Sequence, residues 1–142
     1  MGERRVVVTG LGMLSPLGND VASSWEGIKA GRSGIGPIER FDTTGFNTRI
    51  GGAIRDLDIE AYMPNKDARK MDAFLHYGLI AAQQAVEDSK LNEFDALDRE
   101  RVGVAIGSGI GGLEFIEKSV LVMNESGPRK VSPFFVPATV IN

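Results

Sequence analysis

The 142-residue sequence contains no cysteine and a single histidine, His76. Disulfide bridges, thiolate zinc sites and a cysteine–histidine nucleophilic pair are therefore excluded within these residues. His76 falls in a predicted helix with no nucleophile motif beside it, so we expect a structural histidine, at the surface or half-buried. We expect no catalytic residue and no metal site in this segment.

Long apolar runs and an excess of positive charge are also lacking. No run approaches the roughly 20 residues of a membrane-spanning helix. The formal net charge is −3, which argues against nucleic-acid binding driven by bulk positive charge. The N-terminus enters a predicted strand at Arg5, which leaves no room for a signal or transit peptide. We expect a cytoplasmic protein that binds neither membranes nor nucleic acid.

The 42% hydrophobic content suffices for one domain with a sizeable core. Two β-branched segments predict strands, and the second is typical of a strand buried on both faces; they are Arg5–Thr9 and Val102–Ile106. Helical periodicity predicts three helices, from Asn19 or Asp20 to about Ala30, over about Asp67–Lys90 and over Leu113–Asn124. Gly31 ends the first of these helices, and Gly127-Pro128 ends the third.

Residues 32–64 are rich in glycine and predict a long irregular excursion, with a short edge strand at Ile50–Ile54. Small residues of the long helix (Gly78, Ala81 and Ala85 among them) would let it lie close against a sheet. On the third helix, the apolar positions expected to face inward are Leu113, Ile116, Val120 and Met123. Ala138–Asn142 is typical of the onset of a helix, so we interpret the chain, residues 1–142, as truncated within that helix.

The glycines that follow Val102–Ile106 predict a tight turn and a close approach of the backbone to a neighbour or ligand. Gly107, Gly109 and Gly112 match the dinucleotide-binding fingerprint. That site also needs a second parallel strand with an acidic residue about 20 residues on, where this sequence has prolines. Glycines that serve close packing or line a pocket are the favoured interpretation.

Basic residues gather at two places. Lys66, Arg69 and Lys70 stand at i, i+3 and i+4 and share one helix face, while Arg129 and Lys130 lie in the loop after the third helix. Such clusters in an acidic chain are compatible with docking of an acidic partner or a phosphate, but the residues alone favour a solvated helix face. Phe134 and Phe135, with Ile110, could line a hydrophobic cavity or pack in a core.

Four motifs in order along the whole chain resemble the bacterial β-ketoacyl-acyl-carrier-protein synthases, most closely the type II elongating enzymes. They are Val6–Gly18, Arg69–Phe74, Gly107–Gly112 and Pro128–Pro137. The resemblance implies an α/β thiolase-like fold with α-β-α-β-α layers, of which this chain is most of the N-terminal half-domain. It also implies a homodimer, with no metal or nucleotide cofactor.

The resemblance implies that the whole protein condenses an acyl-enzyme thioester with malonyl-acyl-carrier protein, with decarboxylation, in fatty acid synthesis. The family's catalytic cysteine, histidines and lysine lie beyond the matched segment, so the segment alone should be inactive. Two alternatives stay open: a polyketide ketosynthase, and a non-catalytic carrier-binding or dimerisation fragment.

The resemblance assigns binding roles within this chain. The positions that receive the acidic carrier protein and its phosphopantetheine phosphate correspond to Lys66, Arg69, Lys70, Arg129 and Lys130. Ile110 corresponds to the residue at the bottom of the acyl pocket, where side-chain size limits chain length. Phe135 corresponds to a residue that reaches the pocket of the partner subunit.

Overall fold

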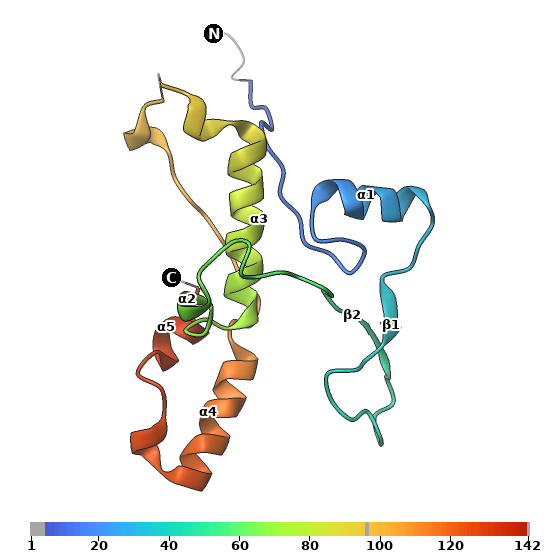
Figure 1. Cartoon of the computed structure of the whole chain (residues 1–142), viewed down its shortest axis with the longest axis vertical. Helices are drawn as coiled ribbons and strands as arrows, with labels where there is room; N and C mark the ends of the chain where they lie inside the picture. Colours follow the sequence, from blue (N-terminus) through green and yellow to red (C-terminus); the bar gives the residue numbers. More distant parts are fainter. Residues whose placement is uncertain (1–4, 96, 142) are drawn as a thin grey trace. The chain divides into compact units, whose positions relative to one another are not determined.

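A computed structural model of the chain describes residues 5–95 and 97–141. The chain divides into two compact units, each described separately below. The first comprises Met1–Leu57 and Ile80–Leu97, and the second comprises Asp58–Leu79 and Asp98–Asn142. The long helix α3, Ala73–Ser89, contributes its first turns to the second unit and the rest to the first (Figure 1).

The first helix of unit 1, α1, spans Val21–Lys29, as predicted. Asp20 is its N-cap, and its Oδ1 accepts a hydrogen bond from the Ser23 backbone N–H at 2.6 Å. That bond satisfies a donor that the helix itself leaves unpaired. Gly31 follows the C-cap with φ +64°, a backbone conformation that glycine adopts without steric cost. The predicted start and end of this helix are both confirmed.

The irregular excursion of unit 1 contains a small antiparallel hairpin. Strand β1, Ile35–Pro37, pairs with strand β2, Ile50–Gly52, and Gly36 lies opposite Gly51. The predicted short strand at Ile50–Ile54 is thus present, two residues shorter than expected. The sequence does not predict its partner β1, because three residues that include a glycine and a proline carry no alternation of apolar and polar side chains.

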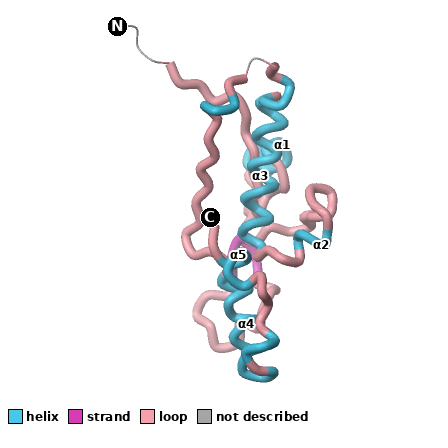
Figure 2. Tube along the Cα trace, turned by 90° about the vertical axis from the view of Figure 1, so that its left-hand side faces the viewer, coloured by secondary structure: helices cyan, strands magenta, loops and turns pink. Residues whose placement is uncertain are grey.

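The predicted strands Arg5–Thr9 and Val102–Ile106 are not strands in this chain. Both segments belong to the loops of Figure 2, outside any ladder of hydrogen bonds. Val104 is 84% exposed, so the burial on both faces expected of Val102–Ile106 is also wrong. Val6, in the first segment, is 90% exposed. A strand requires a neighbouring strand, and β1–β2 is the one sheet among the described residues.

A close approach of backbone to helix does occur in unit 1, at Gly10 and Gly12. A Cβ on Gly10 would overlap the carbonyl oxygen of Ala85, and one on Gly12 would overlap that of Ala81. The Leu11 N–H donates to the Asp88 carboxylate at 2.9 Å on the same helix. The small residues of α3 therefore admit a neighbouring backbone, as predicted, although that neighbour is a loop.

The charged segment after α3 contains two short 3₁₀ turns. The first, η1, spans Leu91–Glu93 in unit 1, and the second, η2, spans Arg99–Arg101 in unit 2. Asp98 is the N-cap of η2, and its side chain accepts a hydrogen bond from the Glu100 N–H at 3.2 Å. Each turn is therefore a local structure within its own unit.

The helix predicted over Asp67–Lys90 is interrupted. A short helix α2 spans Asn65–Ala68, and α3 begins only at Ala73. In unit 2 the His76 ring Nε2 lies 2.9 Å from the carbonyl oxygen of Ala68, at the end of α2. This contact links the end of α2 to the first turn of α3. His76 is a structural histidine as expected, but it is buried, with 8% of its surface exposed, and not at the surface or half-buried.

Unit 2 also holds α4, Leu113–Ser126, which packs against the 3₁₀ turn η3, Pro128–Lys130, and against α5, Phe135–Thr139 (Figure 1). The predicted break at Gly127-Pro128 is confirmed, with Gly127 at φ +86°. The helix expected to begin at Ala138 instead ends at Thr139, and Val140 is extended. Asn142 lies outside the described residues.

The face of α4 that turns inward differs from the predicted one. Leu113 is 60% exposed, and Val120 and Met123 are each 44% exposed, whereas Ile116 is half-buried. The buried residue of α4 is Ser119, whose hydroxyl donates to the Phe115 carbonyl oxygen at 2.7 Å. Helical spacing predicted the helix correctly but could not show which of its apolar side chains are buried in this chain.

Candidate functional site: a basic surface beside an apolar cavity

The basic residues Lys66, Arg69 and Lys70 all come from α2 and the turn that follows it. The turn results from the interruption before α3, so these residues do not continue one long helix face as predicted. Lys66 is exposed. Arg69 is also exposed, and its Nε donates to the Asn65 side-chain oxygen at 2.9 Å.

Lys70 is more constrained than its two neighbours. Its ammonium lies 2.7 Å from the Asp67 carboxylate and 5.6 Å from the centroid of the Phe134 ring. The hydrogen bond from Lys70, and then the charges of Lys70 and Lys66, hold the pKa of Asp67 below its ordinary value. An ion that faces both a carboxylate and a ring face has a defined position, unlike a solvated lysine.

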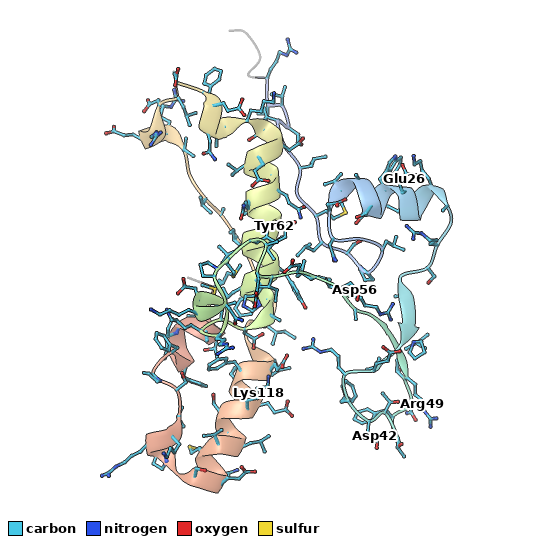
Figure 3. The ribbon with its side chains drawn as sticks, viewed as in Figure 1. Glu26, Asp42, Arg49, Asp56, Tyr62 and Lys118 are labelled. Carbon is cyan, nitrogen blue, oxygen red and sulfur yellow. The ribbon has the colours of Figure 1, made fainter. Side chains whose placement is uncertain are left out.

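The second basic pair, Arg129 and Lys130, forms part of η3 and is exposed. Lys130 borders a small cavity of about 170 Å³ that Lys118 also lines. Figure 3 shows the Lys118 side chain on α4. The Lys118 ammonium lies 2.6 Å from the Glu114 carboxylate, one helical turn earlier. Lys118 therefore adds a cation beside Lys130 that the sequence interpretation missed, because an i, i+4 ion pair on a helix is typical of an ordinary solvated face.

A larger apolar cavity of about 390 Å³ lies within unit 2. Its lining joins the turn after α2, the start of α3, the extended segment before Gly107 and the α5 region; the residues are Lys70, Met71, Leu75, Gly78, Leu79, Ile106, Phe134, Pro137, Val140 and Ile141. Apolar side chains dominate this lining, and Lys70 adds an ammonium group to it. Such a cavity fits an aliphatic or aromatic ligand, or apolar side chains of another segment.

The two residues assigned to the acyl pocket do not line this cavity. Ile110 is 78% exposed, and Phe135 is half-buried in the first turn of α5. Phe134, which the sequence groups with them as a candidate cavity residue, does line the cavity. The pocket roles of Ile110 and Phe135 therefore stay predictions.

In the glycine turn after Ile106, the last two glycines, Gly111 and Gly112, pack closely against another segment of unit 2. Gly111 has φ +83°, and the Gly112 N–H donates to the Thr139 carbonyl oxygen at 3.1 Å. A Cβ on Gly112 would lie 2.8 Å from the Ala138 carbonyl oxygen. The favoured interpretation of these glycines, close packing, is thus confirmed at this end of the run, whereas Gly107 and Gly109 face open space.

Metal ligands and membrane-spanning helices are not found in the part of the chain that the structure describes. No group of three His, Asp or Glu side chains in residues 5–95 and 97–141 is placed to hold a metal ion. No described helix has both the length and the apolar character that crossing a membrane requires. The basic surface and the apolar cavity thus remain the candidate site.

The sequence profile described as β-ketoacyl synthase, N-terminal domain, matches residues 3–142. The chain therefore belongs to the β-ketoacyl synthase family, which confirms the resemblance seen in its four motifs.

Curated relatives share this assignment. The chain is 60% identical over all its residues to 3-oxoacyl-(acyl-carrier-protein) synthase 2 of Vibrio cholerae, and 50% identical to the protein of the same name from Coxiella burnetii. In both comparisons the alignment covers 100% of this chain and 34% of the relative. The chain thus spans about a third of the length of the curated relatives that it matches.

Solved structures show the same fold. A β-ketoacyl synthase from Burkholderia phymatum matches 97% of this chain and 34% of its own with a TM-score of 0.75 and 27% identity. A ketosynthase solved in complex with its type II polyketide acyl-carrier protein and bound to the hexaketide matches 94% of this chain and 36% of its own, with a TM-score of 0.71 and 31% identity. The predicted α/β thiolase-like class is confirmed, and the chain corresponds to the N-terminal part of that fold.

Proposed function

We propose that the protein to which this chain contributes is a condensing enzyme of fatty acid synthesis, a 3-oxoacyl-(acyl-carrier-protein) synthase. The observation that carries the proposal is the 60% identity to such a synthase over the entire chain. In the proposed reaction, an acyl group held as a cysteine thioester is transferred to the carbanion left when malonyl-carrier protein loses CO₂. The cysteine thiol is released, and the product is a 3-oxoacyl-carrier protein two carbons longer.

The chain's own contribution in this proposal is binding. Lys66, Arg69 and Lys70, with Arg129 and Lys130, would receive the acidic carrier protein and the phosphate of its phosphopantetheine arm. The exposure of Lys66, Arg69, Arg129 and Lys130 supports this role, because a docking cation must be accessible to its partner. A structural neighbour is a ketosynthase in complex with an acyl-carrier protein. Ile110 and Phe135 are proposed to line the acyl pocket once the remaining walls are present.

A cytoplasmic homodimer is the proposed state of the whole enzyme. Apolar side chains on the described chain are unusually accessible, with Val6 90% exposed and Ile110 78% exposed. Surfaces of this kind are normally covered by further protein. A second subunit together with the C-terminal half of the fold would cover them.

Two alternatives predict different products. A polyketide ketosynthase is favoured by the solved neighbour bound to a hexaketide, which is 31% identical to this chain. The 3-oxoacyl-(acyl-carrier-protein) synthase 2 of Vibrio cholerae is 60% identical. A non-catalytic carrier-binding or dimerisation fragment is the other alternative. Intact mass of the native protein separates a fragment of 15.3 kDa from a complete enzyme.

The experiment that tests the proposal is a condensation assay with the complete native protein. Acyl-carrier protein and malonyl-carrier protein are supplied, and both CO₂ release and the mass of the product are followed. A single two-carbon extension for each CO₂ supports the proposal. Repeated extension without reduction would favour a polyketide enzyme, and carrier binding without CO₂ release would favour the non-catalytic fragment.

A further inference from the structure

Lys70 differs from the other basic residues of the surface in what its ammonium contacts. It lies 2.7 Å from Asp67 and 5.6 Å from the ring centroid of Phe134, and its side chain is 33% exposed. Lys66, within α2 itself, is exposed. A cation already engaged on two sides has less capacity to meet an incoming acidic partner.

The contact of Lys70 with Phe134 also joins two distant parts of the sequence within unit 2. Lys70 lies in the turn after α2, and Phe134 is the N-cap of α5. Both side chains line the same apolar cavity of about 390 Å³. A lysine stem packs readily against apolar surface while its charged end stays polar, so Lys70 contributes to the wall and holds the ring at the rim.

The contact extends to the segment assigned to the acyl pocket. Phe135 directly follows Phe134 and forms the first turn of α5. The Phe134 backbone N–H donates to the Ser132 hydroxyl at 3.1 Å, so the ring stands on a locally ordered turn. The Phe134 ring is therefore carried by the residue that immediately precedes Phe135 and the start of α5.

We propose that Lys70 is a positioning residue for the acyl side of the site: held by Asp67, its ammonium fixes the Phe134 ring at the rim of the cavity. This changes the docking set proposed above: Lys66 and Arg69 meet the carrier protein, while Lys70 acts through Phe134. This inference rests on the proposed condensing function and divides the basic surface into two roles. It assigns a specificity-determining contact to Phe134, which the family resemblance did not single out.

A double-mutant cycle in the complete enzyme tests the coupling. The variants are Lys70→Gln, Phe134→Leu and the pair, with Lys70→Arg as the conservative variant and Lys29→Gln on α1 as a matched loss of charge. Each is assayed with an acyl-carrier protein and with a carrier-free acyl-pantetheine thioester. Urea unfolding of the same variants measures the contact independently of activity.

Lys70→Gln is expected to lower kcat/KM about two- to fivefold for the carrier-free substrate, the range of a partly exposed cation–π contact. The double variant should have the same kcat/KM as Phe134→Leu alone. Lys70→Arg should keep most of the wild-type kcat/KM, because arginine also stacks on rings. Lys29→Gln should change the activity with neither substrate. Loss confined to the carrier-bound substrate, or multiplicative effects of the two substitutions, would overturn the inference.

The unfolding cycle keeps this result separate from the proposed function. If the complete protein performs no condensation, the proposed function is refuted. Coupling between Lys70 and Phe134 in urea would still establish the contact in that case. Condensation with independent effects of the two substitutions on both kinetics and unfolding would refute the positioning role alone. Absence of coupling in every measurement overturns the inference whatever the enzyme's activity.

Discussion

The Asp72 carboxylate accepts a hydrogen bond from the backbone N–H of Phe115 at 2.7 Å. Asp72 precedes α3, whereas Phe115 is the third residue of α4, a helix whose N-cap, Gly112, has no side chain to cap it. A side chain 43 residues away thus performs the capping that the local sequence cannot provide. A carboxylate at this place also lies at the positive end of the α4 dipole.

Asp72→Ala should lower the free energy of unfolding by about 1–2 kcal/mol, because it removes the cap and leaves a helix donor without its partner. Urea unfolding followed by circular dichroism measures this change. Asp72→Asn is the matched control, since it keeps an oxygen acceptor of the same shape and should lose clearly less. Equal losses for the two variants would mean that the oxygen is not acting as a cap.

Gly12→Ala should destabilise the chain by about 1–3 kcal/mol, the usual cost of forcing an extra methyl group into a packed contact. The new Cβ would overlap the carbonyl oxygen of Ala81 on α3. Gly103→Ala is the control, because a Cβ there meets nothing within 4 Å. Thermal unfolding of both variants tests the close approach. Similar melting temperatures would show that the loop does not rest on α3.

The ion pair of Asp67 and Lys70 predicts a dependence of stability on pH. The pKa of Asp67 is lowered from an ordinary value of 3.8 by the hydrogen bond and charge of Lys70 and by the charge of Lys66. The stabilisation is therefore fully present above that value and is lost as the pH falls through the lower folded-state pKa. The difference in unfolding free energy between wild type and Asp67→Asn should shrink in that acid range and should also shrink with added salt. A constant difference down to the lowest pH would contradict the pair.

Ile110→Phe in the complete enzyme should bias it against long acyl primers, because the proposed function places Ile110 at the bottom of the acyl pocket and a larger side chain there would shorten the space for the chain. Product mass across a series of acyl-carrier proteins measures the profile. Ile110→Val is the matched control and should leave the profile unchanged or slightly lengthened. An unaltered profile for Ile110→Phe would remove Ile110 from the pocket.

Local sequence signals were sufficient to predict the helix ends that depend on residues nearby in the sequence. Asp20 caps α1, Gly31 follows its end, and Gly127-Pro128 terminates α4, all through interactions within a few residues. Features that depend on distant residues could not be obtained in this way. The interruption between α2 and α3 is accompanied by contacts of Asp72 with Phe115 and of His76 with Ala68, and neither contact leaves a periodic signal.

The predicted strands failed for a related reason. Val102–Ile106 has the composition of a central strand, but such a segment forms a ladder only when a neighbouring strand lies beside it. The chain covers 34% of the curated relatives. The sequence predicted the basic residues of the candidate site, because their spacing forms a recognisable pattern. It did not predict Lys118, Met71 and Leu75 as lining residues, because their roles depend on their neighbours in space.

The most direct test of the central claim compares two substrates in the complete enzyme that carries Lys66→Glu and Arg69→Glu. Both positions are exposed, so charge reversal should repel an acidic carrier protein without disturbing the fold. Lys29→Glu on α1 is the control for charge reversal elsewhere on the chain.

The account predicts that the double variant raises KM for acyl-carrier protein by about tenfold or more, an effect that weakens with salt, while the carrier-free acyl thioester reacts at nearly the wild-type rate. Equal loss with the carrier-bound and carrier-free substrates would contradict it, because the surface formed by Lys66 and Arg69 would then not be the carrier-protein docking site.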